Sequence, residues 1–164
     1  MIHLNQKQII EFQQRSYLAT DGLWFMKAEE QYGFTNALGL DNEVWKVMPK
    51  IQARLLKAMA GLGDGLEALA ECLTTKLTLD GSATTARKLD ENNLEIVITR
   101  CPWHDLRVKS GREDISAMVG EVICGSVMSG FAAEFGKDIK VERPLRICRG
   151  AETCRFKFSE PDST

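Results

Sequence analysis

Residues 76–99 read KLTLDGSATTARKLDENNLEIVIT, and this stretch decides the fold. Apolar and polar side chains alternate with a period of two, which is typical of strands, in Lys76–Leu79, Ala83–Leu89 and Leu94–Thr99. The residues between these runs are turn formers, because Asp-Gly and Asn-rich segments adopt tight turns readily. We therefore predict three strands of an antiparallel meander.

The residues before this stretch show the longer period of helices. Apolar side chains recur at helical spacing in Gln6–Tyr32, and Gly33 is a typical helix end. Asp41 is a suitable N-cap for a second helix over Asn42–Met59, which Pro49 would kink or split. A third helix is expected between this one and the strands.

The chain after the strands returns to a helix and then to shorter strands. Ser110 and Glu113 have the spacing of a capping box, which would open a helix that ends near Phe135. Alternating runs follow in Ile139–Glu142, Leu145–Cys148 and Thr153–Phe158, and we expect the last two to form a hairpin. The predicted class is α+β, with N-terminal helices packed on an antiparallel sheet, and with a long helix and a Cys-bearing β-hairpin at the C-terminus. We expect one domain over residues 1–158 and a frayed tail over residues 159–164.

The composition limits the classes of function. With 164 residues, of which 44% are hydrophobic, the chain is large enough for one globular domain with a real core. The formal net charge is only −2, which supplies no strong positive field for a nucleic acid. The first residues form neither the apolar core of a signal peptide nor a membrane span, so we predict a cytoplasmic protein that binds neither nucleic acid nor membrane.

The cysteines carry the strongest chemical signal. Cys148 and Cys154 would face each other across the predicted hairpin, Cys124 lies in the predicted long helix, and Cys101 ends a predicted strand. If these four thiolates converge, they suit tetrahedral zinc or, as an alternative, an iron–sulfur cluster. The competing interpretation is that they are small core residues, as we expect for Cys72.

A resemblance to a known family bears on these cysteines. The segment from Ile123 to Phe158, ICGSVMSGFAAEFGKDIKVERPLRICRGAETCRFKF, resembles the C-terminal half of the 4-vinyl reductase domain, a small-molecule-binding module with a cysteine-liganded zinc. The resemblance places Cys124, Cys148 and Cys154 as zinc ligands in the family's order. Leu145 stands where that family has an acidic ligand, so we infer that Cys101 takes the fourth place, with Glu121 as the alternative.

A second resemblance extends over most of the chain. Four segments, RSYLATDGLWFMKAEEQYGF, EVWKVMPKIQARLLK, VITRCPW and CRGAETCRF, are similar to a bacterial and archaeal family labelled "cytosolic protein". That family is related to the L-2-amino-thiazoline-4-carboxylic acid hydrolases. The kinship implies ring opening at an amidine-type C–N bond of a small carboxylate as an alternative function.

Five residues are predicted to line a ligand pocket. Asp21 and Glu29 lie two helical turns apart and could hold a cationic or amidine group, with Trp24 and Trp103 as apolar wall and Arg54 as the donor to a substrate carboxylate. For each of them the alternative is an ordinary surface or core role.

Two further hypotheses concern Cys101 and the second helix. Cys101 and His104 could be a thiolate nucleophile with its base, or His104 could be a further metal ligand. The apolar residues of MPKIQARLLKAMAGL, residues 48–62, could pair with a second copy in a homodimer.

These expectations combine in one leading function. We expect a small-molecule-binding or sensing domain with a structural zinc ion, because zinc held by four cysteines has no open position for water. The alternatives are a hydrolase of the thiazoline type, in which Asp21 or Glu29 transfers protons, and a scaffold with reduced core cysteines.

Overall fold

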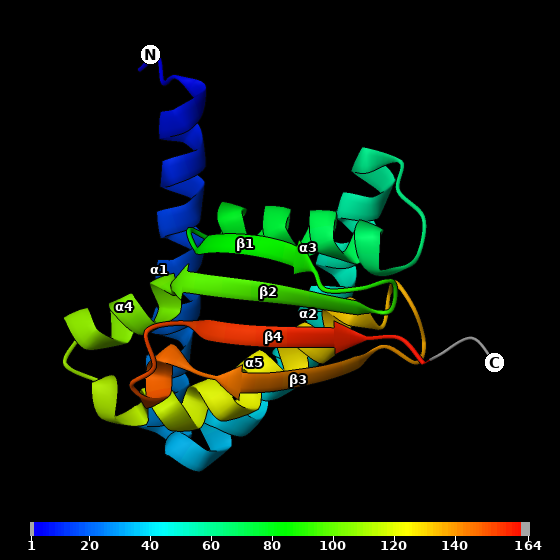
Figure 1. Ribbon diagram of the computed structural model, residues 1–164. Helices are drawn as coiled ribbons and strands as arrows, with labels where there is room; N and C mark the ends of the chain where they lie inside the picture. Colours follow the sequence, from blue (N-terminus) through cyan, green and yellow to red (C-terminus); the bar gives the residue numbers. More distant parts are fainter. Residues whose placement is uncertain (1, 162–164) are drawn as a thin grey trace.

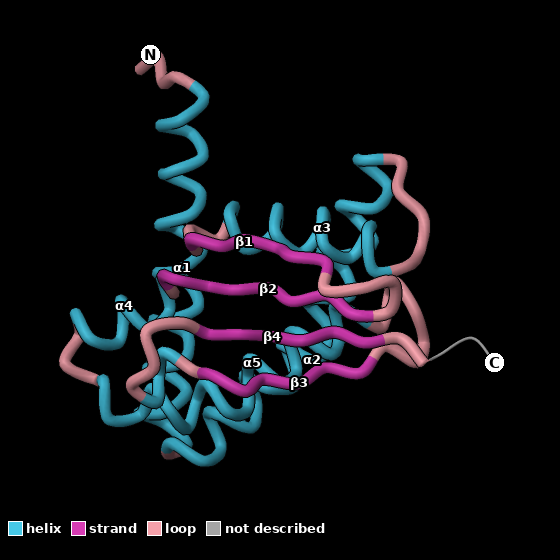
Figure 2. The backbone as a smooth tube through the Cα atoms, viewed as in Figure 1, coloured by secondary structure: helices cyan, strands magenta, loops and turns pink. Residues whose placement is uncertain are grey.

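The computed structural model describes residues 2–161 of the chain. Its helices and strands, in chain order, are α1 (Gln6–Tyr32), α2 (Phe34–Ala60), α3 (Leu66–Leu79), β1 (Ala83–Lys88), β2 (Asn93–Arg100), α4 (Pro102–Lys109), the 3-10 turn η1 (Glu113–Ile115), α5 (Ser116–Ala132), β3 (Lys140–Leu145), the 3-10 turn η2 (Ile147–Arg149) and β4 (Cys154–Ser159). The helices lie behind or beside a four-stranded antiparallel sheet, whose front face is open (Figure 1; Figure 2). The predicted α+β class is confirmed.

The strand order in the sheet differs from the chain order. The strands lie side by side as β1-β2-β4-β3, and every neighbouring pair is antiparallel. The chain leaves β2, passes through α4 and α5, and returns as β3 at the far edge, so that β4 fills the space between β2 and β3 (Figure 1). Of the predicted meander, only the pairing of Ala83–Lys88 with Asn93–Arg100 is present.

The alternating pattern of the two central strands builds the core. Alternate side chains of β2 and β4 are buried toward the helices: Leu94, Ile96, Ile98, Cys154, Phe156 and Phe158. Leu69 and Leu73 of α3 and Phe131 of α5 are fully buried against them. Each such side chain contributes roughly 1.5–3 kcal/mol when it leaves water, so this layer dominates the stability of the fold.

The first two helices follow one another with only Gly33 between them. Asn5 caps α1 through a capping box with Gln8, and Gly33 has the positive φ (79°) that favours glycine at the junction. The expected break before Asp41 is absent, because α2 runs without interruption from Phe34 to Ala60 and passes through Pro49. Asp41 is therefore a buried residue inside a helix and not an N-cap.

Three further local predictions are wrong. Lys76–Leu79 is the last turn of α3, because the apolar face of that helix continues through Leu77 and overrides the short alternating run. Leu145–Cys148 is not a hairpin strand, since Cys148 lies in η2 and β3 ends at Leu145. The predicted capping box of Ser110 and Glu113 does not form, because α4 and η1 come before α5 and no side chain caps η1 or α5.

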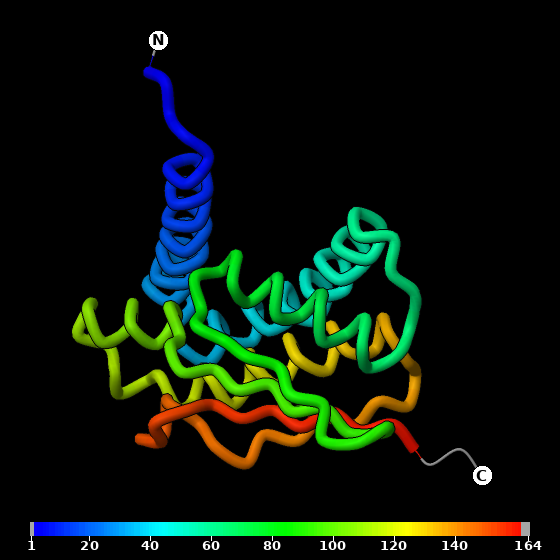
Figure 3. The backbone as a smooth tube through the Cα atoms, turned by 45° about the horizontal axis from the view of Figure 1, so that its top comes forward, coloured from blue at the N-terminus to red at the C-terminus, as the bar shows by residue number. Residues whose placement is uncertain are grey.

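Two apolar surfaces remain uncovered. The first half of α1 projects from the body of the fold, as Figure 3 shows. Along α2, six side chains spaced three or four residues apart are exposed by about half or more: Leu40, Val44, Val47, Ile51, Leu55 and Met59. We call these six residues the α2 stripe. Its C-terminal half, Ile51, Leu55 and Met59, lies in the segment 48–62 that the sequence suggests as a dimer contact. The homodimer stays a prediction.

One helical segment of the described residues, 113–132, is long and apolar enough to span a membrane. It lies at the centre of the fold, packed against α2 and the sheet, and 44% of its apolar window is buried. A buried core helix has the same composition as a membrane span.

Candidate ligand-binding site

Two adjoining cavities lie at the end of the sheet where β2 finishes and β4 begins. The larger cavity has a volume of about 340 Å³ and lies between α1 and α4, with apolar walls that include Leu18, Phe25 and Leu106. The smaller cavity, about 80 Å³, extends toward the sheet and reaches Ile98 and Phe156. Five residues line both cavities: Asp21, Asp41, Trp103, Arg107 and Val119. The two cavities thus share one wall, and that wall carries two carboxylates and one guanidinium.

Aromatic rings form the side of the site next to α2. Trp45 and Trp103 meet edge to face with ring centroids 5.7 Å apart, and Tyr17 packs against both at 6.4 and 5.8 Å. Edge-to-face aromatic pairs of this kind add about 0.5–1.5 kcal/mol beyond the area they bury. The three rings, which come from α1, α2 and α4, therefore hold this wall in a fixed shape.

Two carboxylates meet at the shared wall. Asp41 is buried and Asp21 is largely buried, and the indole N–H of Trp45 donates a hydrogen bond to each of them. Burial raises the pKa of Asp21, while the charge of Arg107 opposes that rise. Burial, together with the charge of Asp21, raises the pKa of Asp41 to about 7. Near neutral pH it is therefore unfavourable for both acids to be ionised, because both negative charges lie in a poorly solvated place.

Two further pairs of charged groups near the cavities neutralise each other. Lys76 and Asp80, both more than nine-tenths buried, form an ion pair at 2.6 Å, and the Lys76 ammonium lies 5.8 Å from the ring centroid of Trp45. Arg112, which lines the larger cavity, binds both oxygens of Glu29 at 2.8 and 2.6 Å. These two pairs carry no net charge.

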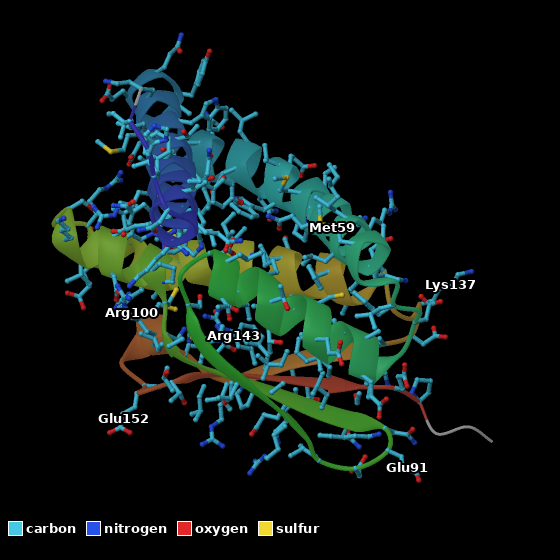
Figure 4. The ribbon with its side chains drawn as sticks, turned by 90° about the horizontal axis from the view of Figure 1, so that it is seen from above. Met59, Glu91, Arg100, Lys137, Arg143 and Glu152 are labelled. Carbon is cyan, nitrogen blue, oxygen red and sulfur yellow. The ribbon has the colours of Figure 1, made fainter. Side chains whose placement is uncertain are left out.

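Four cysteines line the smaller cavity at its other end. They come from four separate elements: Cys101 from the end of β2, Cys124 from α5, Cys148 from η2 and Cys154 from β4. Arg143 of β3 lies among them, with Nη2 3.4 Å from Cys154 Sγ and 3.8 Å from Cys148 Sγ. Figure 4 shows Arg143 inside the fold, whereas Glu91, Lys137 and Glu152 lie at its edge. The sequence predicts that these thiols approach one point. In the structure they line the same cavity, and Arg143 lies among them.

The thiols are not arranged as metal ligands. Across residues 2–161, no three His, Cys, Asp or Glu side chains form a group that could hold a metal ion. The Arg143 guanidinium, which also donates to the carbonyl of Gly120 at 2.7 Å, occupies the position beside two of the sulfurs. The thiolate-bound metal therefore stays a prediction.

Residues 3–149 match the sequence profile described as "Family of unknown function (DUF6125)". The chain belongs to this family. None of the curated proteins compared with it matches significantly.

A solved structure shows the same fold as this DUF6125 chain. It is described as the crystal structure of the phenol-responsive sensory domain of the transcription activator PoxR with phenol. The TM-score is 0.56 at 16% sequence identity, and the match covers 97% of this chain and 76% of the PoxR chain. At this identity the likeness establishes the fold alone. The resemblances to the 4-vinyl reductase domain and to thiazoline hydrolases stay predictions, because neither matched description refers to them.

The five predicted pocket residues of the DUF6125 chain are distributed unevenly. Asp21 and Trp103 line both cavities. Glu29 is bound to Arg112, Trp24 is 49% exposed on α1, and neither residue lines a cavity. Arg54 lines neither cavity and is bound to Glu134 at 2.7 and 2.9 Å. These last three residues do not reach the site.

The paired use of Cys101 and His104 is not supported by the geometry. The Cys101 thiol accepts hydrogen bonds from the backbone of His104 and Trp103, while the His104 ring is bound to the hydroxyl of Ser116 at 2.8 Å. Burial raises the pKa of Cys101 to about 11, so this thiol stays protonated at neutral pH. A base that is engaged elsewhere and a protonated thiol do not make a nucleophile.

Several residues of the site have no clear signal in the sequence. Asp41 resembles a helix cap, Trp45 and Arg107 resemble ordinary helix residues, and Arg143 lies in an unremarkable strand. Gly120 carries one usable hint, since glycine inside a helix needs a packing reason. A Cβ atom at Gly120 would lie 2.9 Å from Cys148 Sγ, so only glycine allows η2 to pack directly on α5.

Proposed function

We propose that this chain is a small-molecule-binding domain of the sensory type, and that the two adjoining cavities hold its ligand. The observation that carries the proposal is the shared wall, where Asp21, Asp41 and Trp103 combine charge and aromatic surface in a buried place. Ligand sites are typically apolar cavities of about 300–1,000 Å³ with a few polar groups that converge, and the larger cavity agrees with this. The fold shared with a phenol-responsive sensory domain also supports the proposal.

The binding role fits the site better than the hydrolase alternative. That alternative assigned proton transfer to Asp21 or Glu29, and of these two only Asp21 lines the cavities. Glu29 is held by two hydrogen bonds from Arg112 and lines neither cavity. One carboxylate pair with a shared indole donor is suited to holding a polar group in place.

We also propose that Cys101, Cys124, Cys148 and Cys154 bind a zinc ion that ties β2, α5, η2 and β4 together. The support is that four soft donors from separate elements line one small cavity, which suits zinc or an iron–sulfur cluster. Binding would require the thiol side chains and the Arg143 guanidinium to turn from their present positions. The ion would supply a structural cross-link and no catalytic step, because four thiolates leave zinc no open position.

The metal proposal is tested by elemental analysis of the purified protein, made without added metal and without oxygen. One zinc per chain, lost together with protection of four thiols when a chelator is added, is the expected result. A brown colour with iron and sulfide would assign the cluster instead. A metal-free folded protein with four freely titrating thiols would refute the proposal.

The ligand proposal is tested by blocking the larger cavity. Ala19 is an exposed lining residue, so Ala19→Trp would narrow the cavity with little strain on the core. Ala58→Trp, on the exposed side of α2 and outside both cavities, is the matched control. We expect any small molecule that raises the melting temperature of the parent to lose this effect in Ala19→Trp and to keep it in Ala58→Trp. Equal effects in both variants would place binding elsewhere.

A further inference from the structure

The charge at the shared wall is not balanced. Asp21 and Asp41 face one resident cation, Arg107, which lines both cavities and lowers the pKa of both acids. No ion pair within 4.0 Å joins Arg107 to either acid among residues 2–161, and its Nη1 is directed to the backbone oxygen of Trp103 at 3.4 Å. One carboxylate therefore has no cation of its own.

The surrounding elements do not supply the missing positive charge. On α3, Lys76 is neutralised by Asp80, and beside α4 Arg112 is neutralised by Glu29. The remaining titratable groups that face the wall are Tyr17 on α1 and His104 on α4; burial raises the pKa of Tyr17, so its phenol stays neutral. Arg143 lies at the thiol end, against Cys148 and Cys154.

Two states can resolve this imbalance. In the first, one of the two acids binds a proton, which removes the excess charge when the cavity is empty. In the second, a cation enters and both acids are ionised. An uncompensated buried charge is unfavourable, so a monocation that pairs with the two acids binds favourably, whereas an anion is repelled.

We infer that the ligand of this site carries one positive charge, as a protonated amine or an amidinium, on an aromatic or aliphatic body. The cationic group would lie between Asp21 and Asp41, beside the face or edge of Trp103, and the apolar body would fill the larger cavity against Phe25 and Leu106. Cations are attracted to carboxylates and to tryptophan rings alike, so one end of the ligand satisfies both. This inference rests on the ligand-binding function proposed above and names the chemical class of the ligand.

Binding of such a ligand displaces a proton. With the pKa of Asp41 near 7, about nine-tenths of the sites hold the extra proton at pH 6 and about one-tenth at pH 8. Because the apparent affinity scales with the fraction of competent sites, a ligand that is protonated throughout this range should bind about tenfold more weakly at pH 6 than at pH 8.

Three matched probes test the charge requirement: benzylamine as the cation, benzyl alcohol as the neutral molecule and benzoate as the anion. Calorimetric titration of the full chain at pH 8 should give benzylamine at least tenfold tighter binding than either of the others. At pH 6, titrations in two buffers with different ionisation enthalpies should show release of close to one proton per benzylamine bound.

Two variants identify the groups responsible. Asp41→Asn and Asp21→Asn should each reduce the preference for benzylamine over benzyl alcohol to threefold or less, and Asp41→Asn should also remove the pH dependence. Asp138→Asn, an exposed residue outside both cavities, is the control and should behave as the parent. Circular dichroism and melting curves verify that each variant is folded. If one of the two Asp variants does not fold, the other alone tests the charge requirement.

The outcomes separate the two proposals. If benzyl alcohol or benzoate binds as tightly as benzylamine in a manner that Ala19→Trp abolishes, the charge inference is wrong and the ligand-binding function stands. If none of the three probes binds, by calorimetry or by ligand-observed NMR at millimolar concentration, both are overturned.

Discussion

Lys76 Nζ lies 2.6 Å from Asp80 Oδ2, and the two side chains are only 5% and 8% exposed to solvent. This pair lies one helical turn apart at the end of α3, next to the Trp45 ring, and holds two charges out of water. Removing one partner leaves the other uncompensated, whereas removing both leaves an apolar site. Substitutions in this pair should therefore change the stability of the protein strongly.

Lys76→Met should destabilise the protein by about 3–5 kcal/mol, because it leaves the buried Asp80 carboxylate without a cation. The double variant Lys76→Met with Asp80→Leu should recover most of that loss, as measured by urea unfolding. Lys46→Met, which breaks an exposed ion pair with Glu43, is the control and should cost no more than about 0.5 kcal/mol. Equal losses for Lys76→Met and Lys46→Met would mean that the buried pair is solvated in solution.

Asp41 should make the stability depend on pH. Its pKa is about 7 in the folded protein against an ordinary value of 3.8, so the folded state binds the proton more tightly than the unfolded state does. The contribution of this carboxyl is then greatest in acid and is lost as the pH rises through 7. Asp41→Asn should therefore gain roughly 1–3 kcal/mol relative to the parent between pH 5 and pH 8.

The measurement is a set of urea unfolding curves of parent, Asp41→Asn and Asp138→Asn at pH 5, 6, 7 and 8 without ligand. A parallel pH profile for parent and Asp41→Asn would show that Asp41 titrates normally.

Two glycines of α5 should respond in opposite ways to the same change. Gly125→Ala places a Cβ in open space and should stabilise the helix by up to about 1 kcal/mol. Gly120→Ala brings a Cβ to 2.9 Å from Cys148 Sγ, and the thiol must turn away. We expect Gly120→Ala to be less stable than Gly125→Ala by about 1–2 kcal/mol and to react faster at Cys148 with a thiol reagent. If Gly120→Ala matches Gly125→Ala in both measurements, η2 does not pack on α5 as described.

The α2 stripe should be covered by a second copy of the chain. The stripe is a row of six apolar side chains, each exposed by about half or more, and continuous apolar patches on a protein surface often mark contacts with other proteins. We expect sedimentation analysis to show a dimer that Ile51→Glu dissociates. Leu89→Glu, at an apolar residue of similar exposure outside α2, should leave the dimer intact. A monomeric parent protein at high micromolar concentration would refute this expectation.

The period of the sequence predicted most of the longer elements but not the order of the strands in the sheet. Gln6–Tyr32 and Ala83–Lys88 follow from local spacing, because one face of each pattern is apolar. The position of β4 between β2 and β3 does not, since strand order depends on which long-range pairing buries more surface. The period also failed for Leu145–Cys148, because a run of four residues is too short to distinguish a strand from the 3-10 turn η2.

The site was predictable only where a residue type is unusual for its place. Asp21, Trp103 and the four cysteines are conspicuous in the sequence, and all of them line the cavities. Asp41 and Trp45 are not, because an aspartate near a helix start and a tryptophan on a helix have commoner explanations. Arg54 was predicted to line the pocket but is bound to Glu134 instead. Glu134 lies 80 residues away in the sequence, and nothing local reveals the pairing.

The position of β4 also determines when the sheet can be completed. Of the four strands, β4 is the last to be synthesised, yet both β2 and β3 need it as their neighbour. Until residues 154–159 emerge from the ribosome, the growing chain holds only the β1–β2 hairpin and an unpaired β3, and the thiol end of the cavity lacks Cys154. A chain interrupted before residue 154 would therefore lose half of its sheet, because β3 would have no neighbouring strand.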